Sequence, residues 1–153
     1  MPLHISRILS GGQTGADRAA LDWAIAHGVP HGGWCPRGRR AEDGPIAALY
    51  ALLETPSRDY EQRTRWNVRD SDATLIVSLS PTLSGGSAYT QRCAEQLNQP
   101  CLHVHPGNDD PQTIKAFLER HRVKTLNVAG PRASSEPGIT EYVSRVLERL
   151  FAA

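Results

Sequence analysis

The sequence predicts one α/β domain over residues 1–153, in which a parallel sheet of about five strands carries helices on both faces. Strand-like apolar runs and helical patterns alternate along the whole chain, which is typical of parallel strands joined by right-handed helical crossovers. The chain has 153 residues, of which 39% are hydrophobic, and this suits a single globular domain. It contains no internal repeat, low-complexity tract or linker.

Five short apolar runs are predicted to form the strands. They are Ile5–Leu9, Val29–Trp34, Thr74–Leu79, Cys101–His105 and Thr125–Ala129. Helices are predicted at Gly15–His27, within Arg58–Asp70, and at Gly86–Leu97, Pro111–His121 and Gly138–Leu150. The last helix is the clearest, because its apolar residues form one stripe at helical spacing: Ile139, Tyr142, Val143, Val146, Leu147 and Leu150.

Several helix starts carry capping signals. Thr14 is predicted to cap the first helix, with Asp17 three residues further on. Asp110 and Glu136 each precede a proline, which is favoured at the first position of a helix. The segment 35–57 is the least regular part of the chain, and a short helix is predicted within it at Ile46–Leu53.

Composition excludes several classes of function. The net charge is +1, so we expect no nucleic-acid partner and no attraction to acidic membranes. No apolar stretch approaches the ~20 residues of a membrane span. The three cysteines form no C-x-x-C pair, and we interpret them as reduced thiols of a cytoplasmic protein. They are Cys35, Cys93 and Cys101.

A glycine-rich turn, Gly11–Gly15, joins the first predicted strand to the first predicted helix. Backbone N–H groups at such a turn point outward at the positive end of a helix dipole, where anions bind. The turn lacks the lysine of a P-loop and the first glycine of the dinucleotide fingerprint, so an NAD dehydrogenase is not expected. The alternative interpretation is a tight turn that only packs the helix on the strand.

A second turn of this kind, Ser84–Ser87, follows the third predicted strand. The carboxyl ends of parallel strands lie at one edge of the sheet, where ligands bind. We therefore expect a cleft for a small anionic ligand at this edge. The residues predicted to bind it in the two turns are Gly11, Gly12, Gln13, Thr14, Gly15, Ser84, Gly85, Gly86 and Ser87.

Arginines near these strand ends are candidates for the charged lining of the cleft. Arg18 lies in the first helical turn, Arg37 follows the second strand, and Arg132 follows the last. Guanidinium groups bind phosphate in a bidentate way. The competing interpretation is that Arg37 belongs to a solvated loop, because acidic residues follow it closely.

Other polar residues receive two interpretations each. His103 and His105 face one side of a strand and would form a metal site only with Cys35 or His31. We favour packing roles for these histidines and predict no metal site. Trp66, Asn67 and Asp70 belong either to a surface helix or to the wall of the cleft.

Six motifs together resemble the putative molybdenum carrier family. They are Gly11–Asp22, His31–Gly44, Glu54–Ser57, Arg63–Asp72, Leu83–Ser87 and Leu126–Arg132. This family is a circularly permuted, YpsA-like branch of the SLOG superfamily. The resemblance covers nearly the whole chain and implies a Rossmann-like three-layer fold. It also implies a nucleotide-like or oxyanion-bearing ligand, with molybdenum cofactor or a nucleotide as candidates.

The same superfamily contains LOG-type phosphoribohydrolases, whose signature is P-G-G-x-G-T-x-x-E with a catalytic glutamate. When the signature is laid on this chain from Ser84, Gly85 and Gly86 match the glycine pair, but Arg92 occupies the glutamate position. An arginine cannot stabilise an oxocarbenium-like transition state as a carboxylate does. Asp17, Glu42 and Asp43 are the acids that remain near the expected cleft.

The sequence thus leads to a main hypothesis and two others. The chain is predicted to bind a small phosphorylated, nucleotide-like or oxyanionic ligand, such as the molybdenum cofactor. The alternatives are a nucleotide-processing hydrolase with an altered catalytic acid and a partner-binding module. We also expect a homo-oligomer, a dimer or larger, because the superfamily commonly assembles and the helix Gly138–Leu150 carries a continuous apolar stripe.

Overall fold

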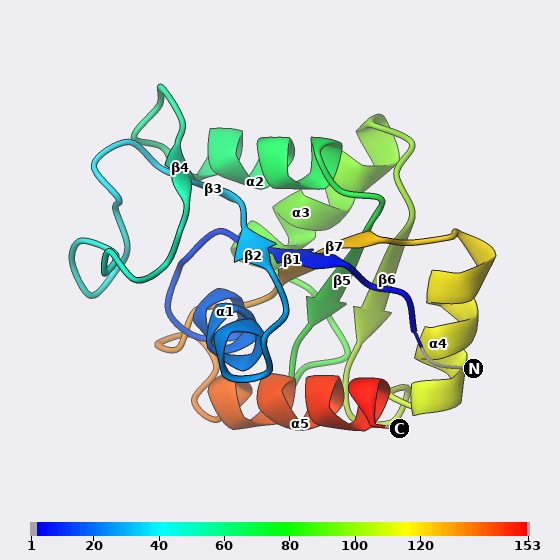
Figure 1. The fold of residues 1–153 in the computed structure, drawn as a ribbon. Coiled ribbons are helices and arrows are strands. Elements are labelled where there is room, and N and C mark those ends of the chain that lie inside the picture. The colour runs from blue at the N-terminus through cyan, green and yellow to red at the C-terminus, as the bar shows by residue number, and fades with distance from the viewer. Residues whose placement is uncertain (1–2, 153) are drawn as a thin grey trace.

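The computed structural model describes residues 3–152 and forms a three-layer α/β sandwich (Figure 1). Five parallel strands make the main sheet, in the order β2-β1-β7-β5-β6. Their bounds are β1 Arg7–Leu9, β2 His31–Gly32, β5 Ala73–Val77, β6 Cys101–Val104 and β7 Thr125–Ala129. The predicted fold class is therefore confirmed, and the last strand of the chain lies in the middle of the sheet.

Helices cover both faces of the sheet, as predicted. Figure 1 shows α1 and α5 on one face and α2 and α3 on the other, with α4 beside the edge strand β6. Their bounds are α1 Ala16–Ala26, α2 Tyr60–Arg69, α3 Gly85–Gln96, α4 Pro111–Arg120 and α5 Ile139–Phe151. All five lie within one or two residues of the predicted ranges.

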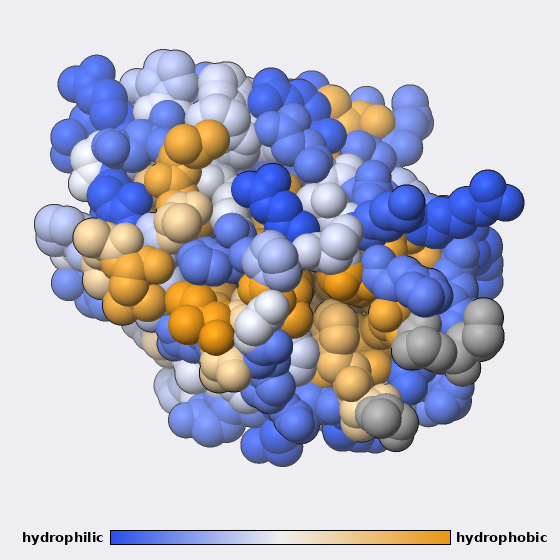
Figure 2. Space-filling model, viewed as in Figure 1, coloured by the Kyte–Doolittle hydropathy of each residue, from blue (hydrophilic) through white to orange (hydrophobic). Residues whose placement is uncertain are grey.

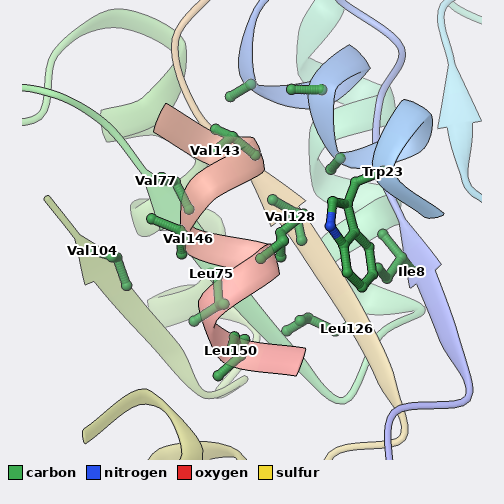
Figure 3. Close-up of a cluster of buried hydrophobic side chains, with 14 of the residues drawn as sticks. Ile8, Trp23, Leu75, Val77, Val104, Leu126, Val128, Val143, Val146 and Leu150 are labelled. Carbon is green, nitrogen blue, oxygen red and sulfur yellow. The ribbon is translucent and has the colours of Figure 1, made fainter. Parts of the chain in front are cut away.

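The main core lies between the sheet and the α1–α5 layer (Figure 3). All six residues of the α5 stripe are buried there, and Val143, Val146 and Leu150 turn toward the strands. Fully burying one such side chain stabilises the fold by about 1.5–3 kcal/mol. The α1 face that meets α5 is built from small alanines, and Trp23 Nε1 donates a hydrogen bond of 2.9 Å to Glu148 on α5. The two helices are thus fixed to each other as well as to the sheet.

The second predicted strand is interrupted. Gly33 has a φ of +128°, and a Cβ there would lie 2.3 Å from the carbonyl oxygen of Ser10. The chain therefore turns at Gly33 and leaves the main sheet. It continues as β3 (Trp34–Cys35), which pairs in parallel with β4 (Leu53–Glu54) in a separate two-stranded sheet that the sequence did not predict.

The short helix predicted at Ile46–Leu53 is wrong, since this segment forms turns that lead into β4. The reason is the guanidinium of Arg39, which lies inside the loop. It donates hydrogen bonds to the carbonyl oxygens of Ile46, Ala47 and Tyr50 at 2.8–2.9 Å, and to that of Leu52 at 3.4 Å. A helix would use these carbonyl groups itself.

Two of the three predicted helix starts are also wrong. Thr14 does not cap α1, because Gly15 is the N-cap residue. The hydroxyl of Thr14 instead donates to Glu42 and accepts from the backbone N–H of Ala133. Pro137 precedes α5 by two residues, because Gly138 is the N-cap and Glu136 instead accepts the N–H of Leu79. The prediction for Asp110 is confirmed, since its side chain accepts from Gln112 and Pro111 begins α4.

The surface offers a different basis for oligomer formation than the sequence suggested. The α5 stripe is buried within the monomer, so it leaves no face for a partner. Among residues 3–152, the exposed large apolar residues are Ile25, Leu49 and Leu53. Figure 2 shows apolar surface in the part of the molecule where Figure 1 places α1 and the β3–β4 sheet. The homo-oligomer stays a prediction. No helix in residues 3–152 has the length and apolar character needed to cross a bilayer.

The role of Arg39 leads to a prediction about the loop 36–55. In Arg39→Met, the carbonyl groups of this loop lose a charged donor, and each such hydrogen bond contributes about 1.5–3 kcal/mol. We expect chymotrypsin to cleave after Tyr50 or Leu52 roughly ten times faster or more than in the wild type. Arg40→Met is the matched control, since Arg40 makes one hydrogen bond, to the carbonyl of Arg58. Equal cleavage of the two variants would contradict the role of Arg39.

Candidate functional site

A cavity of about 390 Å³ lies at the carboxyl edge of the sheet, over the ends of β1, β7 and β5. The chain leaves β1 through α1 on one face and leaves β5 through α3 on the other, and β7 ends between them. This is the crevice where open α/β sheets bind ligands. Its walls come from the β1–α1 turn, α2, the first turns of α3 and the loop 130–136.

The first turn of α3 lines this cavity and contains an unpaired donor. Ser84 is the N-cap residue, and Gly85, Gly86 and Ser87 follow as the first helical residues. A Cβ on Gly86 would meet nothing within 4 Å, so this glycine leaves open space in front of the helix end. The hydroxyl of Ser87 is buried and has no hydrogen-bond partner among residues 3–152. Together with the free N–H groups of a helix N-terminus, it forms a site suited to an anion.

The β1–α1 turn presents a second unpaired donor, the side-chain amide of Gln13. Its Oε1 accepts two backbone hydrogen bonds, from Thr14 at 3.0 Å and from Glu42 at 2.9 Å. These two donors fix which end of the amide carries the oxygen. Its Nε2 is consequently a donor, and it is buried without a partner among residues 3–152.

A buried ion pair connects α1 to α2 at the floor of the cavity. Nη1 of Arg63 lies 3.8 Å from Oδ2 of Asp17 and donates to the carbonyl oxygen of Gly11 at 2.9 Å. The two side chains are 10% and 9% exposed. Burial raises the pKa of Asp17, and the nearby Arg63 guanidinium opposes that rise. Burial likewise lowers the pKa of Arg63.

Two further guanidinium groups line the cavity, and neither has a carboxylate within ion-pair distance among residues 3–152. That of Arg132 lies 5.2 Å from the centre of the Tyr60 ring, and that of Arg92 lies 5.6 Å from the centre of the Tyr89 ring. Both are therefore available to an anionic ligand. Tyr60 and Tyr89 contribute ring surface from α2 and α3.

The loop 130–136 is held against the other walls by two glutamates. Glu42 accepts hydrogen bonds from the hydroxyls of Thr14 and Ser134, and these hydroxyls lower the pKa of this exposed carboxyl group. Glu136 accepts from the N–H of Leu79 at 2.6 Å, at the end of β5. These contacts fix the rim of the cavity before any ligand arrives.

The structure brings seven of the twelve predicted ligand-binding residues to the cavity wall. They are Gly11, Gln13, Ser84, Gly85, Gly86, Ser87 and Arg132. The other five, which are Gly12, Thr14, Gly15, Arg18 and Arg37, do not line it. Arg37 is exposed on the loop 36–55. Arg18 turns toward that loop and pairs with Asp43 at 2.5 Å, while it also donates to the carbonyl of Gly12.

Gly12 and Gly15 are glycines because neighbouring segments leave no room for a side chain at either position. Gly12 has a φ of +80°, and a Cβ there would meet the side chains of Leu52 and Ile46 at 2.7 and 2.8 Å. Gly12 therefore allows the loop 46–52 to pack on the turn, which differs from the ligand-binding role predicted from the sequence. A Cβ on Gly15 would lie 2.6 Å from the backbone of Pro131 and Ala133.

Sequence reasoning missed three cavity residues of α2 and two polar residues at the strand ends. Tyr60, Arg63 and Thr64 line the cavity, as do Ser78 after β5 and Asn127 in β7. Asn127 carried a usable signal, because a buried polar residue in an otherwise apolar strand needs a partner; its Nδ2 donates to Thr74 at 3.1 Å. Arg63 carried none, since nothing in the pattern of α2 distinguishes it from the other arginines there.

Trp66, Asn67 and Asp70 were predicted to belong either to a surface helix or to the cavity wall, and only Asn67 of the three lines the cavity. Asn67 lines the cavity, but its amide is engaged by the backbone of Trp34 at 2.8 and 3.0 Å. Trp66 packs edge-on against Trp34, and Asp70 accepts from Trp34 Nε1. These two residues therefore hold β3 on α2 and lie away from the cavity.

The two strand histidines also have packing partners. His103 Nε2 lies 2.5 Å from the hydroxyl of Ser78, and its ring lies 5.0 Å from that of His105. Burial lowers the pKa of His103. Within residues 3–152, no three His, Cys, Asp or Glu side chains are grouped so that they could hold a metal ion.

Comparisons with known proteins agree with this architecture. The model of the circularly permutated YpsA SLOG family matches residues 8–151. The chain belongs to this family. A crystal structure described as "Putative molybdenum carrier protein" from Syntrophus aciditrophicus SB superposes with a TM-score of 0.95 and 47% sequence identity. The match covers 100% of this chain and 98% of that one. No curated protein gives a significant match.

In this SLOG chain, the glycine pair that matches the LOG signature lines the cavity, and Arg92 stands at the position of the signature's glutamate. Gly85 and Gly86 begin α3 and line the cavity, and Arg92 lies two turns further along the same helix. Of the three acids that remained near the expected cleft, only Asp17 lines the cavity. Glu42 holds the rim and Asp43 pairs with Arg18.

The packing role of Gly12 can be separated from ligand binding. A non-glycine residue in the left-handed conformation lowers the stability of the fold by about 1–2 kcal/mol. In Gly12→Ala the new Cβ would also clash with the side chains of Leu52 and Ile46. We expect urea denaturation to show a larger loss of stability for Gly12→Ala than for Gly28→Ala. Gly28 has a similar φ of +68° with nothing within 4 Å of its Cβ position, and it is the matched control. Equal losses would show that the turn does not need the space at Gly12.

Proposed function

We propose that the chain binds a small phosphorylated, nucleotide-like or oxyanionic ligand in the cavity at the carboxyl edge of the sheet. The observation that carries this proposal is the buried, unpartnered hydroxyl of Ser87 in the first turn of α3. An unpaired buried donor costs about 1–3 kcal/mol, and an anion placed against the helix N-terminus would offset that cost. The unpaired guanidinium groups of Arg92 and Arg132 add positive charge to the same cavity.

The molybdenum cofactor is the specific candidate that family membership favours. Its organic part ends in a phosphate, which the first turn of α3 would hold through Ser87 and the backbone N–H groups. The rings of Tyr60 and Tyr89 would contact the organic part. In this proposal molybdenum arrives already bound to its organic ligand, and the protein carries the assembled molecule.

The role of Ser87 can be tested by calorimetry with inorganic phosphate as the probe. Ser87→Ala removes one donor to a charged group, which corresponds to about 1.5–3 kcal/mol, or roughly tenfold or more in affinity. Ser144→Ala is the matched control, because the hydroxyl of Ser144 donates to the carbonyl of Thr140 on the outer surface of α5. If Ser87→Ala binds phosphate like the control, α3 is not the anion site.

The arginines give an independent test by the same method. Arg132→Gln removes an unpaired charge from the cavity and should weaken phosphate binding several-fold or more. Arg37→Gln removes an exposed charge outside the cavity and should leave the affinity unchanged. The reverse order of effects would place the binding site on the loop 36–55 instead.

A nucleotide-processing hydrolase is the second candidate, and Asp17 is the observation that favours it. Asp17 is the acid whose pKa burial raises, and it lines the cavity, so it is suited to exchange a proton with a bound ligand. Release of free base from nucleoside monophosphates, followed by chromatography, would support this candidate. The same release from Asp17→Asn would show that Asp17 is not the acid.

A further inference from the structure

His103 and His105 form a pair of imidazoles at the edge of the main sheet, outside the cavity. His103 lies in the edge strand β6 and His105 follows the end of that strand, and their ring centres are 5.0 Å apart. Both residues are half-buried, and neither lines the cavity. The pair is therefore a feature that the proposed function does not use, and solvent reaches it.

Hydrogen bonds decide which nitrogen of each ring carries the proton. The hydroxyl of Ser78 has one proton and donates it to the carbonyl oxygen of Ser80 at 2.8 Å. Nε2 of His103 lies 2.5 Å from the same hydroxyl oxygen and must therefore be the donor in that contact. Nδ1 of His105 lies 2.9 Å from the carbonyl oxygen of Pro106, which can only accept, so Nδ1 carries the proton in this ring.

Each ring in its neutral form keeps a free lone pair on its other nitrogen, which is Nδ1 in His103 and Nε2 in His105. No hydrogen bond reaches either nitrogen from residues 3–152. Burial and then the charge of His105 lower the pKa of His103, while the Glu136 carboxylate opposes them, so this ring is neutral at neutral pH. Histidines bind metal ions as neutral imidazoles, through a nitrogen of this kind.

The surroundings of the two rings resemble those of metal-binding histidines. Such a histidine usually donates its other ring N–H to an oxygen atom, which fixes the orientation of the ring, and both rings here already make that contact. The separation of the rings also fits. A zinc ion about 2.0–2.1 Å from one nitrogen of each ring lies roughly 3 Å from each ring centre, so rings 5.0 Å apart can share one ion at an angle near the tetrahedral one.

We propose that His103 and His105 chelate one divalent transition-metal cation, with Zn²⁺ as the model ion, through Nδ1 of the first and Nε2 of the second. The sequence had favoured packing roles for them, because a metal site required Cys35 or His31. The sheet order excludes both of these as ligands, since His31 lies in β2 at the opposite edge and Cys35 continues from there in β3.

Water completes the coordination in this proposal, because no third His, Cys, Asp or Glu side chain joins the pair within residues 3–152. We therefore expect weaker binding than at a structural zinc site, which has four protein ligands. The inference does not rest on the proposed function, because the two sites share no ligand-binding residue.

The test is a calorimetric titration with Zn²⁺ at neutral pH in a buffer without phosphate. We expect the wild type to bind one ion per chain. Removing an outer contact of a metal-bound histidine costs about 10–100-fold in affinity, so Ser78→Ala should weaken binding about tenfold or more, and the loss of a ligand in His105→Gln should weaken it at least as much. His121→Gln is the matched control, because the ring of His121 packs against that of Phe117 at 4.9 Å and should leave the affinity unchanged.

Side-chain ¹⁵N spectra of the histidines give a second measurement, which needs no variant. In the metal-free protein they should show the proton on Nε2 of His103 and on Nδ1 of His105, and Zn²⁺ should shift the other nitrogen of each ring. A wild type that binds no Zn²⁺ would overturn the inference. Equal affinities of the wild type and His105→Gln, or shifts confined to other histidines, would also overturn it, because the ion would then bind elsewhere.

Discussion

The buried guanidinium of Arg63 is the contact on which the geometry of the cavity depends. It belongs to α2, yet its hydrogen bond of 2.9 Å reaches the carbonyl oxygen of Gly11 at the end of β1. It also lies 3.8 Å from Asp17 on α1 and 5.1 Å from the centre of the Tyr60 ring. One side chain therefore joins the two helical layers across the edge of the sheet. Removing one partner of such a buried pair typically costs 3–5 kcal/mol, because the other charge is left uncompensated.

This constraint explains the first glycine of the β1–α1 turn. A Cβ on Gly11 would lie 2.6 Å from Nη1 of Arg63 and 2.9 Å from the Asp17 carboxylate. The glycine is thus required by a protein side chain that approaches the turn. The sequence motif predicted that Gly11 binds the ligand, and the structure shows that part of the space beside it is already occupied by Arg63 and Asp17. The cavity begins beyond this contact, where Gln13, Arg132 and the first turn of α3 present their donors.

The elements of the fold were predictable because each has a strong local pattern. The apolar stripe of α5 and the five buried residues of β5 define their structures without reference to the rest of the chain. The parts that sequence reasoning missed depend on long-range contacts. Arg39 organises the segment 46–52 although it precedes that segment in the chain, and Gly33 turns the chain because Ser10, which follows β1, lies behind it. Likewise, the α3 half of the site follows from a local motif, whereas Arg63 and Tyr60 join the site only through the placement of α2 over the sheet.

The central claim is that the first turn of α3 holds the anion, and backbone NMR tests it most directly. In a titration of the ¹⁵N-labelled protein with inorganic phosphate, the account predicts that the largest amide shifts occur at Gly85, Gly86 and Ser87. These residues lie at the helix N-terminus with the unpartnered hydroxyl. Saturating shifts confined to another region, such as the exposed loop that carries Arg37, would contradict the account.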